Sequence, residues 1–304
     1  MSFPVTVIIA TRDRKEDVCN ALRSVLLQDL PLEIIVADDA STDGTAEAVS
    51  SGFPQVHVLR SEEWGGSTTA RNLAASKATG YFLVFLDDDV LLPDQTTLSR
   101  SLLDFDDPVI GAVAIPFINV NRDGVLRQRS PDSKSTYVTS TYTGCAAAVR
   151  RDLFVSLGGY RTSIKHMNEE VDFCLRMLDA GYVTKLGTAQ PVLHLAGPHL
   201  HRDSPRREAR RDHILGRRSD ILSEWCNAPA LFLPMAWFRS ILRGFNLGIQ
   251  TRRLGWSIEG LLYGFGACLR FFRERRPVST TTYRLAQRLR RRGPIRLDEI
   301  AETR

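Results

Sequence analysis

The chain has 304 residues, 43% of them hydrophobic, so it can bury a sizeable core and exceeds the usual size of one domain. Its formal net charge of +5 is unevenly divided. Residues 1–199 contain 18 Lys and Arg against 25 Asp and Glu, a net charge of −7. Residues 200–304 contain 22 basic residues, all Arg, against 10 acidic ones, a net charge of +12. Five scattered cysteines without a CxxC pair argue against a disulfide framework or a structural zinc site and favour a reducing compartment.

Short apolar runs alternate with helical spacing along the first part of the chain. The N-terminus opens into such a run with no basic leader, so we expect a cytoplasmic protein. We predict strands at 5–11, 32–37, 55–60 and 81–86, with helices at 15–28, 45–50 and 67–77. This alternation predicts an α/β fold, a Rossmann-like and mostly parallel sheet flanked by helices.

The middle of the chain continues the pattern with longer connections. An apolar run covers residues 109–118, and a polar segment follows at 130–137. Residues 144–149 (GCAAAV) lead into a helix predicted near 151–157, which Gly158 and Gly159 end. A second helix at 168–180 ends at Gly181, and residues 182–195 hold one or two strands.

The pattern changes near residue 200, so we expect a first domain at 1–200 and a basic, amphipathic helical region at 201–304. Helices are predicted at 204–226, 229–251 and 256–275. Charged residues interrupt the two apolar helices before either reaches the roughly 18 residues needed to cross a membrane: Arg239, Arg243, Glu259 and Arg270. We expect them to lie on an anionic membrane surface; helices covering the sheet or joining a homo-oligomer are the alternatives, and nucleic acid is a weaker candidate.

Three consecutive carboxylates, Asp87, Asp88 and Asp89, follow the fourth predicted strand directly. Ligands of open parallel sheets bind beyond the carboxyl ends of the strands. Three carboxylates repel one another unless a cation lies between them, and Mg²⁺ or Mn²⁺ with phosphate oxygens would supply it. The alternative is an acidic helix start, since acids favour a helix N-terminus.

Two further motifs precede this one. Asp38 and Asp39 end the second strand, where a carboxylate can accept hydrogen bonds from a base or a ribose, or can cap a helix. Gly65 and Gly66 would let the backbone approach a ligand, and Arg71 follows on a helix where it could reach a base or phosphate. Taken alone, Arg71 would be a surface residue.

Two motifs near residues 166–195 complete the set. Glu169 and Glu170 open a helix, where a carboxylate could remove a proton from an acceptor hydroxyl or could merely complement the helix dipole. His194 lies among apolar residues and fits either a core histidine or a third ligand for a divalent ion beside the aspartates.

The order of these motifs resembles the family-two inverting glycosyltransferases of the GT-A fold, of the type that builds bacterial cell-envelope glycans. The series TRDR, VADDASTDGT, GGSTTARN, LDDD, TGCAAAV, EEVD and His194 carries the resemblance over residues 3–195. The family usually has Asp where this chain has Glu170, and the region after residue 200 has no strong motif.

The resemblance implies a role for each matching residue. The nucleotide-sugar would be held by Thr11, Arg14, Asp38, Asp39, Arg71, Asp87 and Asp88. The Mn²⁺ or Mg²⁺ ion would be held by Asp89, Asp87 and His194. The acceptor base would be Glu170, with Glu169 as the competing assignment.

We therefore expect a metal-dependent transferase that moves a sugar from a UDP- or dTDP-sugar to a hydroxyl of a lipid-linked or cell-surface glycan, at the inner face of the cell membrane. The single carboxylate cluster near the acceptor fits inversion better than double displacement. A sugar-1-phosphate nucleotidyltransferase would need a glycine-rich loop after the first strand, which TRDRKED lacks. A non-catalytic membrane scaffold is the other alternative, against which the LDDD and EEVD segments argue.

Overall fold

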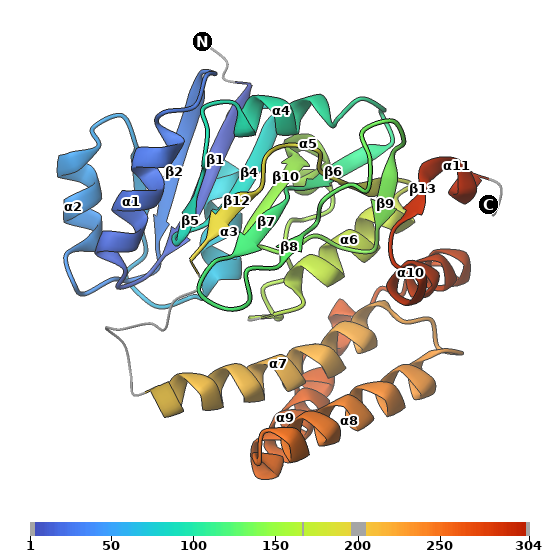
Figure 1. The fold of residues 1–304 in the computed structure, drawn as a ribbon. Coiled ribbons are helices and arrows are strands. Elements are labelled where there is room, and N and C mark those ends of the chain that lie inside the picture. Colours follow the sequence, from blue (N-terminus) through green and yellow to red (C-terminus); the bar gives the residue numbers. More distant parts are fainter. Residues whose placement is uncertain (1–3, 166, 196–204, 302–304) are drawn as a thin grey trace.

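A nine-stranded sheet forms the centre of the computed structural model, which describes residues 4–165, 167–195 and 205–301 (Figure 1). In spatial order its strands are β13 (Ile295–Arg296), β9 (Tyr137–Thr139), β11 (Val183–Leu186), β6 (Ile110–Ala114), β10 (Ala146–Arg150), β4 (Phe82–Asp87), β1 (Val5–Thr11), β2 (Leu32–Asp38) and β3 (His57–Arg60). The pairings make seven of them run in one direction and β9 and β10 in the other. The predicted α/β architecture with a mostly parallel sheet is confirmed.

The register of the parallel strands brings three polar side chains to one edge of the sheet. Thr11 at the end of β1 pairs with Asp38 at the end of β2, and Ala10 pairs with Asp87 at the end of β4. The carboxyl ends of β1, β2 and β4 therefore meet at the edge where ligands of such sheets bind.

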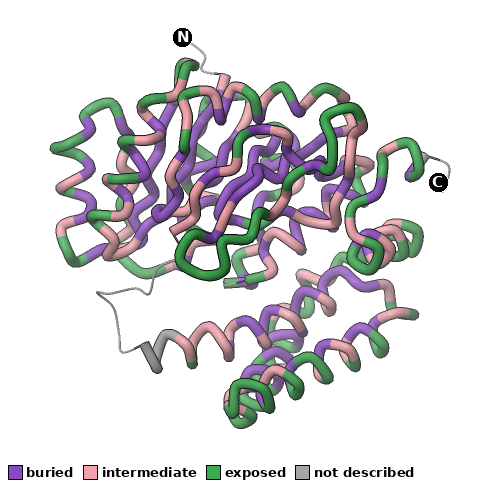
Figure 2. Tube along the Cα trace, in the orientation of Figure 1, coloured by how far each residue is buried: buried purple, intermediate pink, exposed green. Residues whose placement is uncertain are grey.

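Helices cover both faces of the sheet: α1 (Lys15–Val25), α2 (Thr45–Gly52), α3 (Ser67–Lys77), α4 (Thr97–Leu103), α5 (Arg151–Ser156) and α6 (Glu169–Asp179). Successive strand residues point to opposite faces, so Val7 and Ile9 pack in the core with α1, α2 and α4, while Ile8 packs in the core with α3 and α5. Figure 2 shows the strands buried between these layers. The sheet edge is thereby held rigidly from both sides.

A second, four-stranded sheet positions His194. Its strands, in order, are β5 (Val90–Leu91), β12 (Val192–His194), β7 (Phe117–Asn119) and β8 (Leu126–Arg127). His194 pairs with Val90 and Asn119, and the Leu195 N–H donates to the Asp89 carbonyl at 3.0 Å. The apolar run at 109–118 contains two strands, β6 and β7, which are separate because Pro116 lacks the N–H that a continuous strand would need.

The C-terminal part is helical: α7 (Pro205–Asn227), α8 (Leu233–Gln250), α9 (Leu254–Arg270), the 3₁₀ turn η1 (Phe272–Glu274), α10 (Thr280–Arg292) and α11 (Leu297–Ala301). The boundary expected at residue 200 lies outside the described residues. β13 pairs with β9 of the large sheet, and α10 packs against α6, so the end of the chain returns to the first part. Within the described ranges, no helix combines the length and apolar character needed to cross a bilayer.

Asp172 on α6 joins the two parts of the chain. Its side chain is fully buried and accepts hydrogen bonds from Arg161 (3.0 Å), Arg176 (2.9 Å) and Asn227 of α7 (2.7 Å). Two guanidinium groups and an amide thus compensate one buried carboxylate. Removing the carboxylate would leave buried positive charge uncompensated, which is far more costly than losing a surface ion pair.

We predict that Asp172→Ala lowers the free energy of unfolding by about 3–5 kcal/mol, measured by urea denaturation. The matched control is Asp152→Ala, because that side chain is 89% exposed and pairs only with neighbouring Arg151, so a change within about 0.5 kcal/mol is expected. Equal effects of the two substitutions would contradict the role given to Asp172.

Candidate active site

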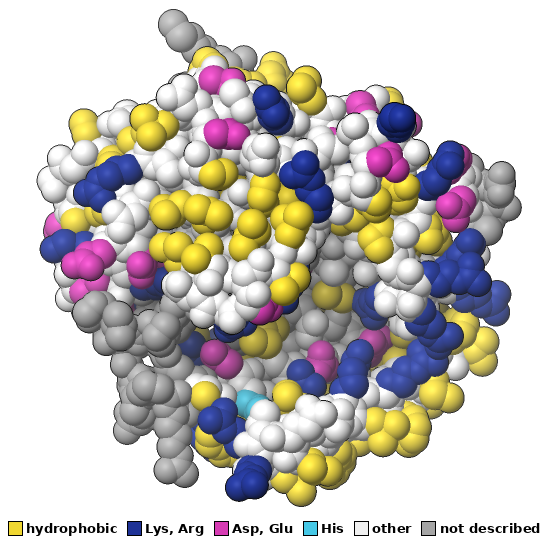
Figure 3. All heavy atoms as spheres, viewed as in Figure 1, with side chains coloured by type: hydrophobic (Ala, Val, Ile, Leu, Met, Phe, Trp, Pro, Cys, Tyr) yellow, Lys and Arg dark blue, Asp and Glu magenta, His cyan; other side chains and the backbone are white. Residues whose placement is uncertain are grey.

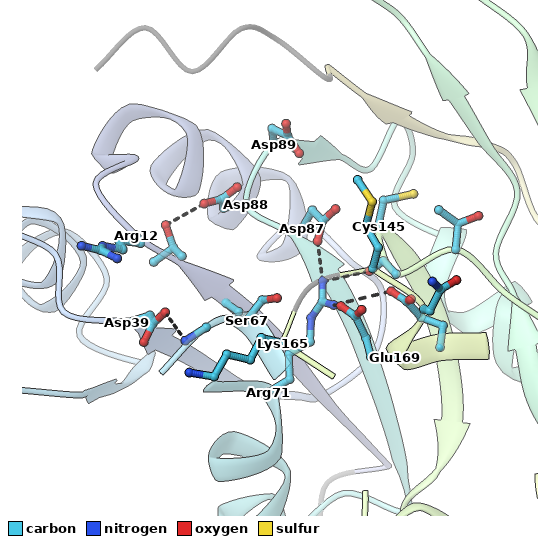
Figure 4. Close-up of a pocket in the computed structure, with 18 of the residues that line it drawn as sticks. Arg12, Asp39, Ser67, Arg71, Asp87, Asp88, Asp89, Cys145, Lys165 and Glu169 are labelled. Carbon is cyan, nitrogen blue, oxygen red and sulfur yellow. Dashed lines mark hydrogen bonds and ion pairs between the residues drawn. The ribbon is translucent and has the colours of Figure 1, made fainter. Parts of the chain in front are cut away.

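A cavity of about 650 Å³ opens beside the carboxyl edge of the large sheet. Its walls come from the ends of β1 and β4, the start of α3, the loop at 141–145, the start of α6 and two residues of α7. Figure 4 shows Asp87, Asp88, Asp89, Arg71 and Glu169 around it. Segments that are distant in sequence therefore share one site.

Asp87, Asp89 and His194 form a cluster whose ligand atoms all lie within 4.8 Å of one another. His194 Nε2 lies 3.3 Å from Asp89 Oδ1 and 4.0 Å from Asp87 Oδ2. On its other side, His194 Nδ1 lies 2.6 Å from the amide oxygen of Asn119, which can only accept, so the geometry assigns the Nδ1 proton to this bond. Nε2 is then the ring nitrogen that faces the two aspartates, where a cation would take the place of its proton.

The charges around Asp89 suit a metal ligand. Burial alone would raise the pKa of Asp89, but its hydrogen bond to His194 and the charge of Arg14 outweigh burial and lower the pKa to about 2. For His194, burial lowers the pKa, and the hydrogen bond to Asp89 and the Asp89 charge outweigh it and raise the pKa. Asp89 is therefore ionised at neutral pH, and His194 exchanges a proton for any cation that it binds.

Asp88 turns away from this cluster. It accepts a hydrogen bond from the Thr11 hydroxyl at 2.8 Å and lies 3.1 Å from Arg14 Nη1. Arg14 also contacts Asp89 through Nη2 at 2.9 Å, so one guanidinium links both aspartates. Burial raises the pKa of Asp88 to about 7, although the charge of Arg14 opposes it. Thr11, Arg14 and Asp88 all line the cavity.

The two carboxylates after β2 have different positions. Asp39 lines the cavity and accepts the N–H groups of Gly65 (2.8 Å) and Gly66 (2.9 Å), which shapes the loop leading into α3. Asp38 is fully buried, accepts the Ser41 N–H at 2.9 Å and is not among the cavity-lining residues. Its observed contact is with the turn that follows β2, so Asp38 caps no helix.

Arg71 lies between Asp87 and the two glutamates at the start of α6. Its Nη2 donates to Asp87 Oδ1 at 2.5 Å and to the Gly144 carbonyl at 3.1 Å, and its Nη1 lies 3.9 Å from both Glu169 and Glu170. Arg71 is buried, with 4% of its surface exposed. The surface position that the sequence alone favoured for Arg71 is therefore wrong.

Glu170 has the properties of a proton acceptor. Burial, with the charge of Glu169, raises the pKa of Glu170 to about 8 against the opposing effect of Arg71. Burial also raises the pKa of Glu169, opposed by Arg71. Gly144 lies directly against this carboxylate, since a Cβ there would sit 2.0 Å from Glu170 Oε1. A glycine at 144 is required for Glu170 to occupy its observed position.

The backbone before α6 is held in an uncommon conformation. Met167 and Asn168 both have positive φ angles, 59° and 68°. The Asn168 side chain donates to Asp220 of α7 at 2.8 Å, and α7 contributes Arg211 and Leu215 to the cavity. The C-terminal helices thus help to place Glu169 and Glu170 and form part of the site.

Several cavity residues were missed from the sequence. Arg12 and Lys165 both contact the Trp64 ring, each with its charged group 5.7 Å from the ring centroid. Arg12 and Trp64 belong to the quoted motifs TRDR and EEWGG but were not selected there. Asn119 and Arg211 carried no motif at all; only the folded chain brings them to the site.

The sequence and the fold were also compared with those of known proteins. The model of the family described as Glycosyl transferase family 2 matches residues 6–158. An uncharacterized glycosyltransferase of Haemophilus influenzae is 26% identical over 200 residues, which cover 62% of this chain and 67% of that protein. The O-antigen chain rhamnosyltransferase WbaN of Salmonella anatum is 26% identical over 196 residues, covering 60% of each chain. The chain thus spans about two thirds or less of these relatives.

A solved structure has the same fold. The mannosyltransferase PcManGT of Pyrobaculum calidifontis, in complex with GDP-Man and Mn²⁺, superposes with a TM-score of 0.57 at 22% identity, over 91% of this chain and 89% of that one. This likeness extends the GT-A architecture into the C-terminal helices. The family model matches half of the sequence, and the two relatives described above are glycosyltransferases. The chain is therefore a glycosyltransferase and belongs to glycosyl transferase family 2.

Proposed function

We propose that this glycosyltransferase moves a sugar from a nucleoside diphosphate donor to an acceptor hydroxyl with inversion, aided by Mn²⁺ or Mg²⁺. The observation that carries the proposal is the convergence of Asp87, Asp89 and His194 within 4.8 Å, at the sheet edge that also presents Glu170. A scaffold without activity would have no need of such a cluster beside a carboxylate with a raised pKa.

The residues fit a divalent cation. Two carboxylates and one imidazole are a donor set that Mn²⁺ accepts, and Asn119 already orients the imidazole with Nε2 toward the aspartates. When bound, the cation would neutralise the charge that develops on the diphosphate leaving group. Arg14 would keep Asp88 and Asp89 in place during this step.

The protein groups would perform the proton transfer. Glu170 would take the proton of the acceptor hydroxyl, whose oxygen attacks C1 of the sugar while the bond from C1 to the diphosphate breaks. Attack from the face opposite the leaving group inverts the anomeric centre. Arg71, held by Asp87 and Gly144, would keep Glu170 close to the reacting atoms and supply positive charge near the leaving group.

The donor would lie between Thr11, Arg14, Asp39 and the metal site, with the cationic pair Arg12 and Lys165 near its phosphates. We expect a UDP- or dTDP-sugar, because family resemblance points there. PcManGT is complexed with GDP-Man, so a purine donor is the competing possibility. Binding of a panel of nucleotide-sugars would decide between the two classes of base.

The acceptor would approach from the side of α7. A second cavity, lined by Arg210, Ile214, Glu259 and Tyr263, shares Arg211 and Leu215 with the first. An extended acceptor could therefore run from Glu170 across α7 and α9. We propose a lipid-linked or cell-surface glycan, because one relative acts on the O-antigen chain, and a peripheral location on the inner face of the cell membrane.

We predict that Glu170→Gln lowers kcat by about 10²–10⁴-fold with little change in donor affinity, since it removes the base but not the donor contacts. Glu169→Gln is the matched control and should lose far less. Steady-state kinetics with a competent acceptor, with calorimetry for donor binding, measure both. A larger loss in Glu169→Gln would transfer the role to Glu169.

The raised pKa of Glu170 predicts a pH dependence. A carboxyl group with a pKa of about 8 is mostly protonated below that pH, and only its ionised form can accept a proton. Therefore kcat/KM should rise with pH and level off above about 8. A profile that is flat on both sides of this value would contradict Glu170 as the base.

Asn119→Ala should weaken Mn²⁺ binding by about 10–100-fold, because it removes the partner that fixes the His194 tautomer. Isothermal titration with Mn²⁺ measures the change. Asn121→Ala is the control, since Asn121 is an exposed residue just after β7. Equal affinities of the two variants would show that the orientation of His194 does not matter for metal binding.

A further inference from the structure

A third cavity, separate from the two described above, lies between α8 and α10, and the proposed reaction does not use it. Its volume is about 390 Å³. Five of its lining residues are arginines: Arg239, Arg284, Arg288, Arg291 and Arg292. Among the described residues that line it, none is acidic, and the others include Phe232, Met235 and Tyr283. Figure 3 shows Lys and Arg side chains gathered where α8 and α10 face each other.

The positive charge of this cavity is poorly compensated by the protein. Arg239 donates to the amide oxygen of Gln287 at 3.4 Å, and Arg284 lies over the Phe232 ring at 5.7 Å. The Nε atom of Arg288 is buried without a hydrogen-bond partner. Glu224 does not line the cavity; it accepts a hydrogen bond from the Tyr283 hydroxyl at 2.9 Å and lies 3.8 Å from Arg290, which is also outside the lining. Guanidinium groups that converge in this way favour an anion with several oxygens, such as a phosphate.

The surface next to this cavity is apolar and exposed. On α8, small residues face inward: Ala236, Ser240, Gly244 and Gly248. Large apolar residues on α8 and just before it face solvent: Leu231, Met235, Phe238, Leu242, Phe245 and Ile249. A soluble helix shows the opposite arrangement, with its large residues buried. Met235 belongs to both the cavity and this apolar face, so the two surfaces are continuous.

Helix α9 repeats the inverted pattern. Its buried residues include Ser257, Gly260, Gly264 and Ala267, and a Cβ at Gly260 would lie 2.7 Å from the Ile214 carbonyl of α7. Its exposed residues include Leu254, Ile258, Leu262 and Leu269. The small residues of α8 and α9 thus form the contacts between helices. The large apolar side chains of both helices face outward, where they can contact an apolar environment outside the protein.

We infer that the exposed faces of α8 and α9 enter the interfacial layer of a membrane and that the arginine-lined cavity binds the phosphate of an anionic phospholipid headgroup. The apolar faces match the acyl region, and the adjoining arginines match the headgroup layer above it. This inference rests on the proposed location of the enzyme at the membrane and adds the surface and the lipid charge that it recognises.

The charge is tested with vesicles of phosphatidylcholine, with or without phosphatidylglycerol, in a sedimentation assay of the full chain. Arg284→Glu/Arg291→Glu should lower binding to the phosphatidylglycerol vesicles by about thirtyfold or more. The matched control is Arg23→Glu/Arg100→Glu, which makes the same charge change in the last turns of α1 and α4. All four arginines are exposed, so both variants should fold. Equal losses in the two variants would overturn the cavity as a headgroup site.

The apolar face is tested separately. Phe238→Ser/Leu242→Ser should lower binding to the same vesicles by about a hundredfold, because it removes two large side chains from the inserted face. Leu27→Ser/Leu103→Ser is the control, since these leucines are 63% and 76% exposed elsewhere on the molecule. An unchanged affinity for Phe238→Ser/Leu242→Ser would overturn the insertion.

Other occupants give other results. Saturable binding of inorganic phosphate that is lost in Arg284→Glu/Arg291→Glu, with vesicle binding unchanged, would make the cavity a free-phosphate site. Binding to duplex DNA but not to vesicles, or a dimer in sedimentation equilibrium that Phe238→Ser/Leu242→Ser dissociates, would also overturn the inference. Hydrolysis of the donor with Mn²⁺ should be equal in the four double variants, two of arginines and two of apolar residues. This assay tests the proposed reaction independently of membrane binding.

Discussion

The mutual repulsion of carboxylates at one edge of the sheet is the constraint on which the site depends. The register of β1, β2 and β4 places Asp38 and Asp87 at the same edge of the sheet, and Asp87, Asp88, Asp89, Glu169 and Glu170 all line one cavity. Two arginines compensate part of this charge, Arg14 at Asp88 and Asp89 and Arg71 at Asp87 and the glutamates. The charge that remains, beside the imidazole of His194, is what a divalent cation with a diphosphate would balance.

The same crowding separates the carboxylates into different chemical states. Asp89, hydrogen-bonded by His194 and paired with Arg14, stays ionised, whereas burial beside Glu169 raises the pKa of Glu170 to about 8. One cavity therefore contains a carboxylate suited to a metal ion, Asp89, and a carboxylate suited to accept a proton, Glu170. Transfer of a sugar to a hydroxyl needs both functions. Gly144 and the turn at Met167 and Asn168 hold Glu170 where this difference can be used.

Local sequence patterns predicted the strands and the motif residues because both depend on neighbours in the chain. The apolar runs at 5–11 and 32–37 and the carboxylates that follow them specify parallel strands with a polar edge. The position of Arg71 depends instead on contacts with residues far along the chain, Asp87 and the Gly144 carbonyl. Asp38 makes a local contact, with the Ser41 N–H, but its complete burial depends on the packing of the whole sheet. Asn119 and Arg211 reach the site only through strand pairing and helix packing, for which no local pattern exists.

The account as a whole is tested most directly by locating the metal. Crystals of the protein grown with Mn²⁺ and a nucleoside diphosphate would be measured at the manganese absorption edge. The account predicts one anomalous peak within bonding distance of Asp87 or Asp89 oxygens and His194 Nε2, on the cavity side that faces Glu170. A peak held by other residues, or none while the nucleotide is clearly bound, would contradict it.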